Sequence, residues 1–287
     1  MHLATGEALE GGWDGVEAFG AKVGERYVSC WSDMRGRAPG GTCERGVLAM
    51  RDRGRSWEEA AEFSERKGCG CGAAMRTMVC GLRFPITDDR LIASAVEASR
   101  VTHNQGCGIL SGVVAAAFTA LSLTDTPLEN FPHLVLTSLA PRTKAYLLSR
   151  SAPPPPPMAA YERQEERFLR FWRLWEAGDA RVKIAEAEIS DPRARDERFK
   201  ALGGGWDACS SVVIAFEALR HAKCDWAKFL TYAAIHGGDS DSTAAIGGAW
   251  FGARFGPVPA LPYPNTHDGV EYKDRCTRIA QAMLRLR

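Results

Sequence analysis

The chain has 287 residues, with 36 Lys and Arg against 35 Asp and Glu, a formal net charge of +1 and 45% hydrophobic residues. This apolar content excludes disorder along the whole chain, and the length suffices for a sizeable buried core. The balanced charge argues against nucleic-acid binding through a broad basic field, which requires an excess of Lys and Arg.

The sequence also gives expectations about compartment. The longest apolar stretch, 110–123, contains Ser and Thr and is shorter than the roughly 20 residues that cross a bilayer. The opening residues 1–15 lack the basic segment followed by an apolar one that marks a signal peptide. The nine cysteines include no pair of Cys-x-x-Cys motifs, so we expect reduced thiols and no structural zinc site. We therefore expect a soluble, cytoplasmic protein without a membrane partner.

Apolar residues recur at helical spacing through the first half of the chain. This pattern predicts helices over 2–9, 15–34, 73–82, 88–102 and 110–123. The stretch 110–123 is apolar nearly all round, which predicts a central helix. Residues 35–54 are rich in Gly, Arg and Pro and are predicted to form a loop.

The helical pattern continues through the second half. It predicts a helix within 128–149 that starts after Pro132, one over 161–188, one capped by Ser210 and Ser211, two over 226–236 and 242–255, and a last one from about Asp274. Prolines fill positions 153–157, so 151–158 is predicted to be a stiff polyproline surface connector, with a ligand for a proline-recognition domain as the alternative. No segment alternates with period two. The sequence therefore predicts an all-α fold and a single domain over 1–287.

The most informative segment is HGGDSDST, residues 236–243. Its glycines allow a sharp turn, and Asp239, Asp241 and Ser242 follow where a helix is predicted to begin. Carboxylate and hydroxyl oxygens are hard ligands that suit Mg²⁺, Mn²⁺ or Ca²⁺ rather than zinc. Because the two aspartates are two residues apart in a turn, both can face one cation. The segment predicts a divalent-cation site, with an ordinary helix N-cap as the alternative.

The helix that follows this segment is rich in small residues. They are Ala244, Ala245, Gly247, Gly248, Ala249 and Gly252. Small side chains allow neighbouring helices to approach closely in a soluble chain. We therefore expect this helix to be packed tightly, with its acidic end held in place.

A second segment, KGCGCGAAMR over 67–76, places glycines at 68, 70 and 72 directly before a predicted helix. Backbone N–H groups and the positive end of the helix dipole there suit a phosphate, with a flexible turn as the alternative. The spacing is not that of a Walker A or Rossmann motif. In a third segment, RVTHNQGCG, His103 follows a predicted helix. A lone histidine in such a place is ordinarily a cap or a packed polar group.

Taken together, these segments resemble the ADP-ribosylglycohydrolase family, and most closely its ADP-ribosylarginine hydrolase branch. The likeness is carried by HGGDSDSTAAIGGAWFG at 236–252, GCGAAMR at 70–76, GLRFP at 81–85 and RVTH at 100–103, with further similarity in DMRGRAPGG at 33–41 and MHLATGEAL at 1–9. It extends over nearly the whole chain and is weakest across 151–202. It implies the compact orthogonal helical bundle of that family.

The resemblance also implies roles for individual residues. Asp239, Asp241 and Ser242 match ligands for a pair of magnesium ions, and His103 matches a histidine that lines the ribose site. The turn that matches the holder of the ADP-ribose diphosphate consists of Gly68, Cys69, Gly70, Cys71 and Gly72. The implied reaction is magnesium-dependent hydrolysis of the N-glycosidic bond between ADP-ribose and arginine. The implied partner is an ADP-ribosylated protein or ADP-ribose, and we expect a monomer.

The sequence departs from the family pattern at its start. The family's remaining metal ligands and its acid/base carboxylate come from a GDALG-like start and a Ser-Asp-Asp-Thr stretch before the residues that match MHLAT, and this sequence starts at Met1. No catalytic acid or base is therefore assigned, and we expect a weakened metal site and a less stable core. Glu7, Glu10 and Asp14 are nearby but lack the Asp-Asp-Thr pattern. The alternatives are a non-catalytic relative that binds ADP-ribose or a protein partner, and a truncated or mis-started gene product.

Overall fold

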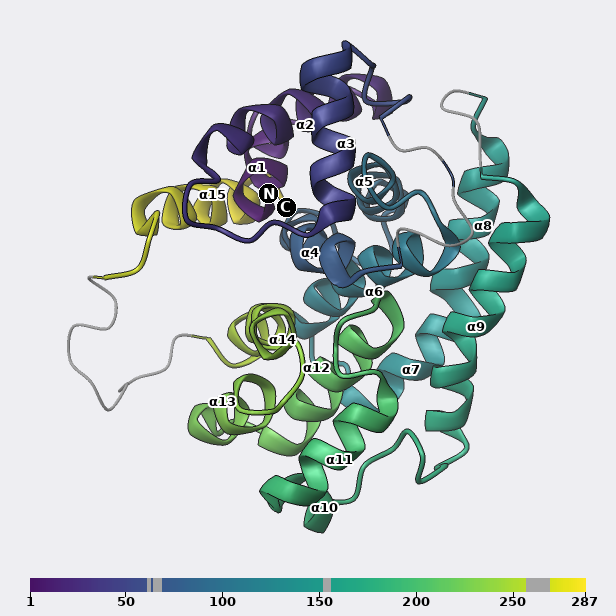
Figure 1. Ribbon diagram of the computed structural model, residues 1–287, viewed down its shortest axis with the longest axis vertical. Helices are drawn as coiled ribbons and strands as arrows, with labels where there is room; N and C mark the ends of the chain where they lie inside the picture. Colours follow the sequence, from purple (N-terminus) through teal and green to yellow (C-terminus); the bar gives the residue numbers. More distant parts are fainter. Residues whose placement is uncertain (61–62, 64–68, 152–155, 257–268) are drawn as a thin grey trace.

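The computed structural model describes residues 1–60, 63, 69–151, 156–256 and 269–287. In these residues the fold is built from helices (Figure 1), and β-type pairing is confined to one isolated bridge between Gly70 and Asp207. The predicted all-α fold is confirmed. Among the described residues, no helix combines the length and the apolar character needed to cross a membrane.

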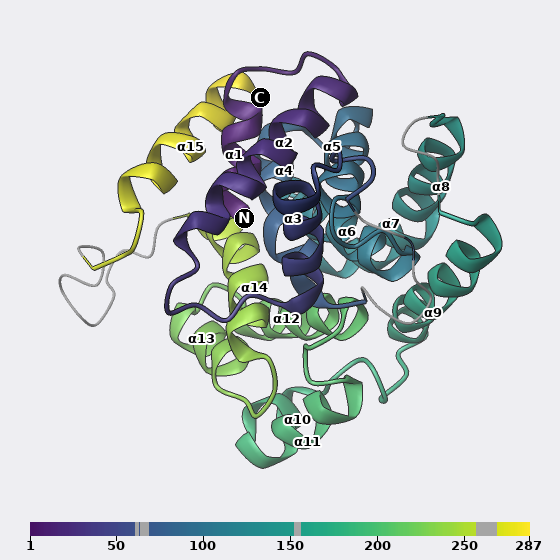
Figure 2. The same cartoon turned by 45° about the horizontal axis from the view of Figure 1, so that its top comes forward.

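Helix α6 (Gly106–Ser122) lies at the centre of the molecule (Figures 1 and 2), and all its residues are buried. The helices α4 (Ala74–Arg83), α5 (Asp89–Arg100), α12 (Ala208–Ala222) and α14 (Ser240–Phe255) pack around it. The contact with α4 is close, because a Cβ atom added at Gly81 would lie 1.9 Å from the carbonyl oxygen of Ala116. On the α14 side, the indole N–H of Trp250 donates to the carbonyl oxygen of Ala115 at 3.0 Å. These contacts hold α4 and α14 against the same central helix.

The two ends of the chain meet on one side of this core. Helix α1 (His2–Glu10) packs on α2 (Val16–Cys30), α4 and the last helix, α15 (Lys273–Leu286), which Figure 1 shows beside it. A 3₁₀ turn, η1 (Trp31–Asp33), follows α2 and leads by a loop to α3 (Gly41–Arg53). The opposite end of the molecule is formed by α10 (Glu186–Ser190) and α11 (Pro192–Leu202), as Figure 2 shows. The remaining elements are η2 (Cys71–Ala73), η3 (Leu128–Asn130), α7 (Phe131–Leu134), a π-helical turn (Val135–Leu139), α8 (Ala140–Ser149), α9 (Met158–Glu176) and α13 (Trp226–Ala234).

Three local predictions are wrong. The predicted loop 35–54 contains α3, whose Val47 and Ala49 are buried and whose end is capped by Gly54 in the left-handed conformation. The predicted helix 161–188 ends at Glu176, because Gly178 adopts a positive φ and its N–H donates to the carbonyl oxygen of Trp175. In both cases a glycine with a positive φ marks the end of the helix, Gly54 after α3 and Gly178 after α9.

The third wrong prediction concerns the N-cap of α12. Asp207, rather than Ser210 or Ser211, caps this helix by accepting from the N–H groups of Cys209 and Ser210. The Ser210 hydroxyl instead donates to the Asp207 carboxylate at 2.8 Å. Of the predicted polyproline connector, residues 152–155 lie outside the described residues.

Candidate functional site

Asp239 stands at the N-cap position of α14 without using its side chain as a cap. Its carboxylate instead accepts a hydrogen bond from the Cys71 thiol at 3.2 Å. Ser242, one turn into the helix, lies 3.4 Å from the same sulfur and donates to Met75 Sδ at 3.1 Å. We call residues 236–242 the acidic turn and residues 68–72 the glycine turn. The acidic turn therefore faces the glycine turn, and the ordinary capping role does not account for Asp239.

The Asp239 turn is held in place by the segment 203–207. The N–H of Asp239 donates to the carbonyl oxygen of Gly204 at 2.7 Å. A Cβ atom added at Gly238 would lie 2.1 Å from that same oxygen, so only glycine fits this approach. The hydroxyl of Thr243, in α14, donates to the carbonyl oxygen of Ala233, in α13. These bonds orient the Asp239 carboxylate before any ligand is bound.

The glycine turn enters η2 and then α4, as the sequence predicts. Its start is fixed by a hydrogen bond from the N–H of Ala208 to the carbonyl oxygen of Cys69 at 2.7 Å. Space at Gly72 is tight, because an added Cβ would lie 3.0 Å from both Cys43 Sγ and His103 Cε1. No side chain caps the η2 start at Gly70, which leaves its first N–H groups available to an anion.

His103 lies beneath this turn. It is only 2% exposed, and its Nδ1 lies 2.7 Å from the hydroxyl of Thr102. Burial, with Arg76 and Arg45 nearby, holds the pKa of His103 well below its usual value. The imidazole is therefore neutral at physiological pH, and its Nε2 edge faces the glycine turn.

One cavity of about 940 Å³ joins these segments. Of the predicted site residues, its walls contain Gly70, Cys71, Gly72, His103, Asp239, Asp241 and Ser242. Cys69 is not among the lining residues, because its thiol points to the amide oxygen of Gln105 at 2.6 Å. Gly68 lies outside the described residues. Three motifs that are far apart in sequence thus meet at one cavity.

At the acidic end of the cavity, the charged form of the Asp239 carboxyl is disfavoured. Burial raises the pKa of Asp239, and its hydrogen bond with the exposed Asp241 carboxyl raises it further. Burial and the Asp239 charge raise the pKa of the Cys71 thiol to about 12, so this thiol stays protonated and donates. A bound cation would favour the charged form of the Asp239 carboxyl, whose ionisation burial and Asp241 oppose.

The donor set fits a hard cation in part. Asp239, Asp241 and Ser242 offer two carboxylates and a hydroxyl, which suit Mg²⁺ because this ion is often held by one or two carboxylates and keeps several waters. In the part of the chain that the structure describes, no group of three or more His, Cys, Asp or Glu side chains is placed to hold a metal ion. Water or substrate oxygens would therefore complete the coordination.

The other acidic residues near the chain start lie in ion pairs rather than in this cavity. Glu7 pairs with Arg275 at 2.7 Å, Glu10 with Arg278, and Asp14 with Lys22. None of the three is among the cavity residues. They do not substitute for metal ligands.

Several cavity residues were missed by sequence reasoning. Trp206, 64% exposed, stands on the rim, and the buried Arg76 lies below, where it donates to the carbonyl oxygens of Ala98 and Ser99. His2 also lines the cavity, and burial lowers its pKa to about 4. A further wall consists of Ala38, Pro39, Gly40, Gly41, Thr42 and Cys43. The segment 33–41 was noted in the sequence for its family likeness, but nothing local showed that it, or the glycine-rich segment 203–207, meets the acidic turn.

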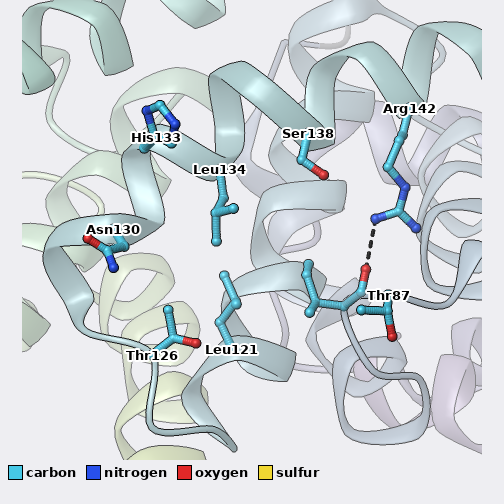
Figure 3. Close-up of a pocket in the computed structure, with 9 residues that line it drawn as sticks. Thr87, Leu121, Thr126, Asn130, His133, Leu134, Ser138 and Arg142 are labelled. Carbon is cyan, nitrogen blue, oxygen red and sulfur yellow. Dashed lines mark hydrogen bonds between the residues drawn. The ribbon is translucent and has the colours of Figure 1, made fainter.

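A second cavity of about 620 Å³ lies between the α4–α5 loop and α7–α8 (Figure 3). Its one cationic lining residue, Arg142, donates to the carbonyl oxygen of Ile86 at 2.7 Å and pairs with Asp89 at 2.8 Å. In Figure 3, the side chains of Leu121 and Leu134, which both line this cavity, point toward each other. With its charge neutralised and none of the predicted residues present, this cavity is the weaker candidate.

Comparisons with known proteins show the family to which the whole chain is similar. A family model described as ADP-ribosylglycohydrolase matches residues 1–287. ADP-ribosylhydrolase ARH1 of Dictyostelium discoideum is 29% identical over 98% of this chain and 78% of its own length. A protein of Acanthamoeba polyphaga mimivirus, provisionally named ADP-ribosyl glycohydrolase L444, is 28% identical over 92% of this chain, which spans about half (52%) of that relative. An uncharacterized protein of Archaeoglobus fulgidus is 27% identical over 82% of this chain and 64% of its own length.

Proposed function

The chain belongs to the ADP-ribosylglycohydrolase family, and from that premise we propose that it hydrolyses the N-glycosidic bond between ADP-ribose and arginine in mono-ADP-ribosylated proteins, with Mg²⁺ as cofactor. Hydrolysis of an ADP-ribosyl bond is supported by the similarity to the ADP-ribosylhydrolase ARH1 of Dictyostelium discoideum. The arginine linkage is supported by the motifs that resemble the ADP-ribosylarginine hydrolase branch.

The observation that carries this proposal is the contact between the acidic turn and the glycine turn across one cavity. Cys71, in the glycine turn, donates to the Asp239 carboxylate, so an anion on the turn would lie beside a cation on the aspartates. A nucleotide diphosphate linked to a ribose needs both kinds of group at this separation. A simple capping motif or a flexible turn would not require the two to converge.

Each residue then has a chemical task. The N–H groups at Gly70–Gly72 would bind the diphosphate oxygens at a helix start. Neutral His103 would contact the ribose without adding positive charge. Asp239, Asp241 and Ser242 would hold the cation, which supplies Lewis-acid polarisation and orientation of hydroxyl groups when bound. The half-buried position of the site limits competing water around these groups.

The decisive experiment measures release of ADP-ribose from ADP-ribosylated arginine by the purified chain, with Mg²⁺ and with Mg²⁺ removed by a chelator. We expect release with Mg²⁺ and its loss on chelation, followed by recovery when Mg²⁺ is restored. ADP-ribosylated serine is the matched alternative substrate. Release from serine but not from arginine would overturn the linkage assignment, and equal release without metal would overturn the cofactor.

A second candidate function is binding of ADP-ribose without turnover. It is favoured by one observation: within the described residues, no third His, Cys, Asp or Glu joins the two aspartates to form a metal-holding group. Calorimetry with ADP-ribose separates the two candidates. Tight binding together with no release from any ADP-ribosylated amino acid would establish the binding role instead of the hydrolase.

A further inference from the structure

One wall of the cavity is a loop with few attachments. We call residues 34–40, between η1 and α3, the rim loop, and its Ala38, Pro39 and Gly40 line the cavity. Most of its residues are exposed. A Cβ atom added at Gly36 or Gly40 would meet nothing within 4 Å, so the loop is not packed against neighbours at either glycine.

Arg37 provides the long-range hydrogen bonds of the rim loop. Its guanidinium donates to both carboxylate oxygens of Glu271, with NH1 at 3.1 Å, and to the hydroxyl of Tyr272 at 3.3 Å. The same side chain donates to the carbonyl oxygen of Asp33 at 2.7 Å and to its carboxylate at 3.1 Å. We call Arg37, Asp33, Glu271 and Tyr272 the clasp. Among the described residues, every other hydrogen bond of the rim loop is local.

The far side of the clasp is a strained start of a helix. Tyr272 precedes α15 with φ 58°, a left-handed conformation that non-glycine residues rarely adopt. Its hydroxyl donates to the Asp33 carboxylate, and the Arg37 guanidinium lies 5.9 Å from its ring centroid. Such strain persists where surrounding contacts enforce it. The clasp therefore joins the rim loop to the residue at which α15 begins.

We propose that Arg37 is a positioning residue for the nucleotide cavity: through Glu271 and Tyr272 it ties the rim loop to the start of α15, and so holds the wall formed by residues 38–43 against the bound ligand. This inference rests on the proposed ADP-ribose site. Arg37 itself is not a cavity residue, so it acts through the loop rather than by touching the ligand.

The exposure of the clasp determines how much its loss should weaken ADP-ribose binding. The clasp is exposed, so its ion pairs are screened by salt and each contributes modestly. Loss of the clasp would free a glycine-containing loop while leaving Asp239, Asp241 and the glycine turn in place. Affinity for ADP-ribose should fall by about fivefold, a change in the range of exposed pairs, whereas kcat should change little.

The binding experiment uses Arg37→Ala, Glu271→Ala and the double variant, with ADP-ribose titrated calorimetrically at low and high salt. We expect each single variant to weaken binding about fivefold and the double variant to weaken it no further, because both remove one unit. The charge exchange Arg37→Glu with Glu271→Arg should restore part of the affinity. Arg278→Ala is the matched control, since it removes an ion pair between α15 and Glu10 of α1 that does not reach the rim loop.

A second readout does not depend on the ligand. Cys43 lies at the end of this wall and is half-buried, and Cys224 is exposed elsewhere. Thiol alkylation followed by peptide mapping should show Cys43 reacting several-fold faster in Arg37→Ala than in the wild type, with Cys224 unchanged. Unaltered Cys43 labelling would overturn the clasp, whatever the ligand proves to be.

The two proposals fail in different ways. If wild-type protein neither binds ADP-ribose nor releases it, the proposed function is wrong, and Cys43 labelling alone decides the clasp. If wild-type protein binds ADP-ribose and Arg37→Ala binds it equally well, the function stands and the positioning role is wrong. An equal loss of kcat and affinity would also contradict positioning, because it would mean general disruption of the site.

Discussion

The thiol of Cys71 donates to a carboxylate oxygen of Asp239 at 3.2 Å although 168 positions separate the two residues in the sequence. The contact joins the start of α4 to the start of α14, and both helices are fixed by packing on α6. The distance between the two turns is therefore set by the core. Changes on either turn should alter ligand binding before they alter the fold.

Asp239→Asn and Asp241→Asn should each reduce ADP-ribose release at least about 100-fold, because a metal contributes several kcal/mol of charge stabilisation and 1.36 kcal/mol is a tenfold change in rate. Turnover of ADP-ribosylated arginine at saturating Mg²⁺ is the measurement. Asp125→Asn is the control, since Asp125 lies on an exposed loop outside the cavity. Retained turnover in either site variant would count against the metal assignment.

Gly72→Ala should weaken ADP-ribose binding about tenfold, or about 1.4 kcal/mol. The added methyl would lie 3.0 Å from Cys43 Sγ and His103 Cε1, so the turn must shift. Gly70→Ala should bind nearly normally, because its Cβ would meet the nearest atom at 3.6 Å, whereas the larger Gly70→Val should obstruct the turn. Calorimetric dissociation constants test this order. Equal affinities for the Gly72 and Gly70 alanine variants would refute the diphosphate turn.

Gly81→Ala and Gly252→Ala should change stability in opposite directions. A methyl at Gly81 would collide with the Ala116 carbonyl oxygen and should cost about 3 kcal/mol or more of unfolding free energy, at the upper end for overpacking. Gly252 is exposed on α14 with nothing within 4 Å, so alanine there should stabilise by about 0.5–1 kcal/mol. The measurement is the free energy of unfolding of each variant in urea, compared with that of the wild type. Stabilisation by Gly81→Ala would mean that α4 and α6 are further apart than described.

Glu217→Gln should destabilise the protein most at neutral pH, by about 3 kcal/mol as expected for a broken buried pair. Burial alone would raise the pKa of Glu217, but the nearby His221 imidazole and hydrogen bonds from Arg220 and Trp175 lower it below its usual value. Because the folded pKa is lowered, the carboxylate stabilises the fold above about pH 4.5, and this contribution is lost as the pH falls through the folded value. The difference in unfolding free energy between wild type and variant should therefore shrink in acid. Glu129→Gln, at an exposed position, is the control and should change the free energy of unfolding little.

The sequence could predict those parts of the site that depend on local chemistry. The starts of α4 and α14 follow from glycines and acidic residues placed before helical stretches, and the structure puts both helices where the pattern predicted them. The buried character of α6 follows equally from its composition. Each of these features depends on residues within one or two helical turns.

The parts that could not be predicted depend on distant partners. Arg37 gives no local sign that it meets Glu271, 234 positions later, and Trp206 gives none that it stands over the cavity. The helix α3 was missed because glycine and arginine near residue 41 masked a short buried stripe at Val47 and Ala49. Local propensity cannot reveal which loop the core brings to a site.

Both cavity turns are fastened to the same short stretch of backbone. The carbonyl oxygen of Gly204 accepts from the N–H of Asp239, and the N–H of Ala208 donates to the carbonyl oxygen of Cys69, so the five residues 204–208 act as a common bracket. A displacement of this bracket would carry both turns in step and preserve their spacing. Helix α11 anchors this bracket, because the N–H of Gly204 donates to the carbonyl oxygen of Phe199 at 2.7 Å, and its Arg195 and Asp196 contact the backbone at Ile235 and Gly237. Substitutions in α11 that shift this anchor should therefore move both turns together.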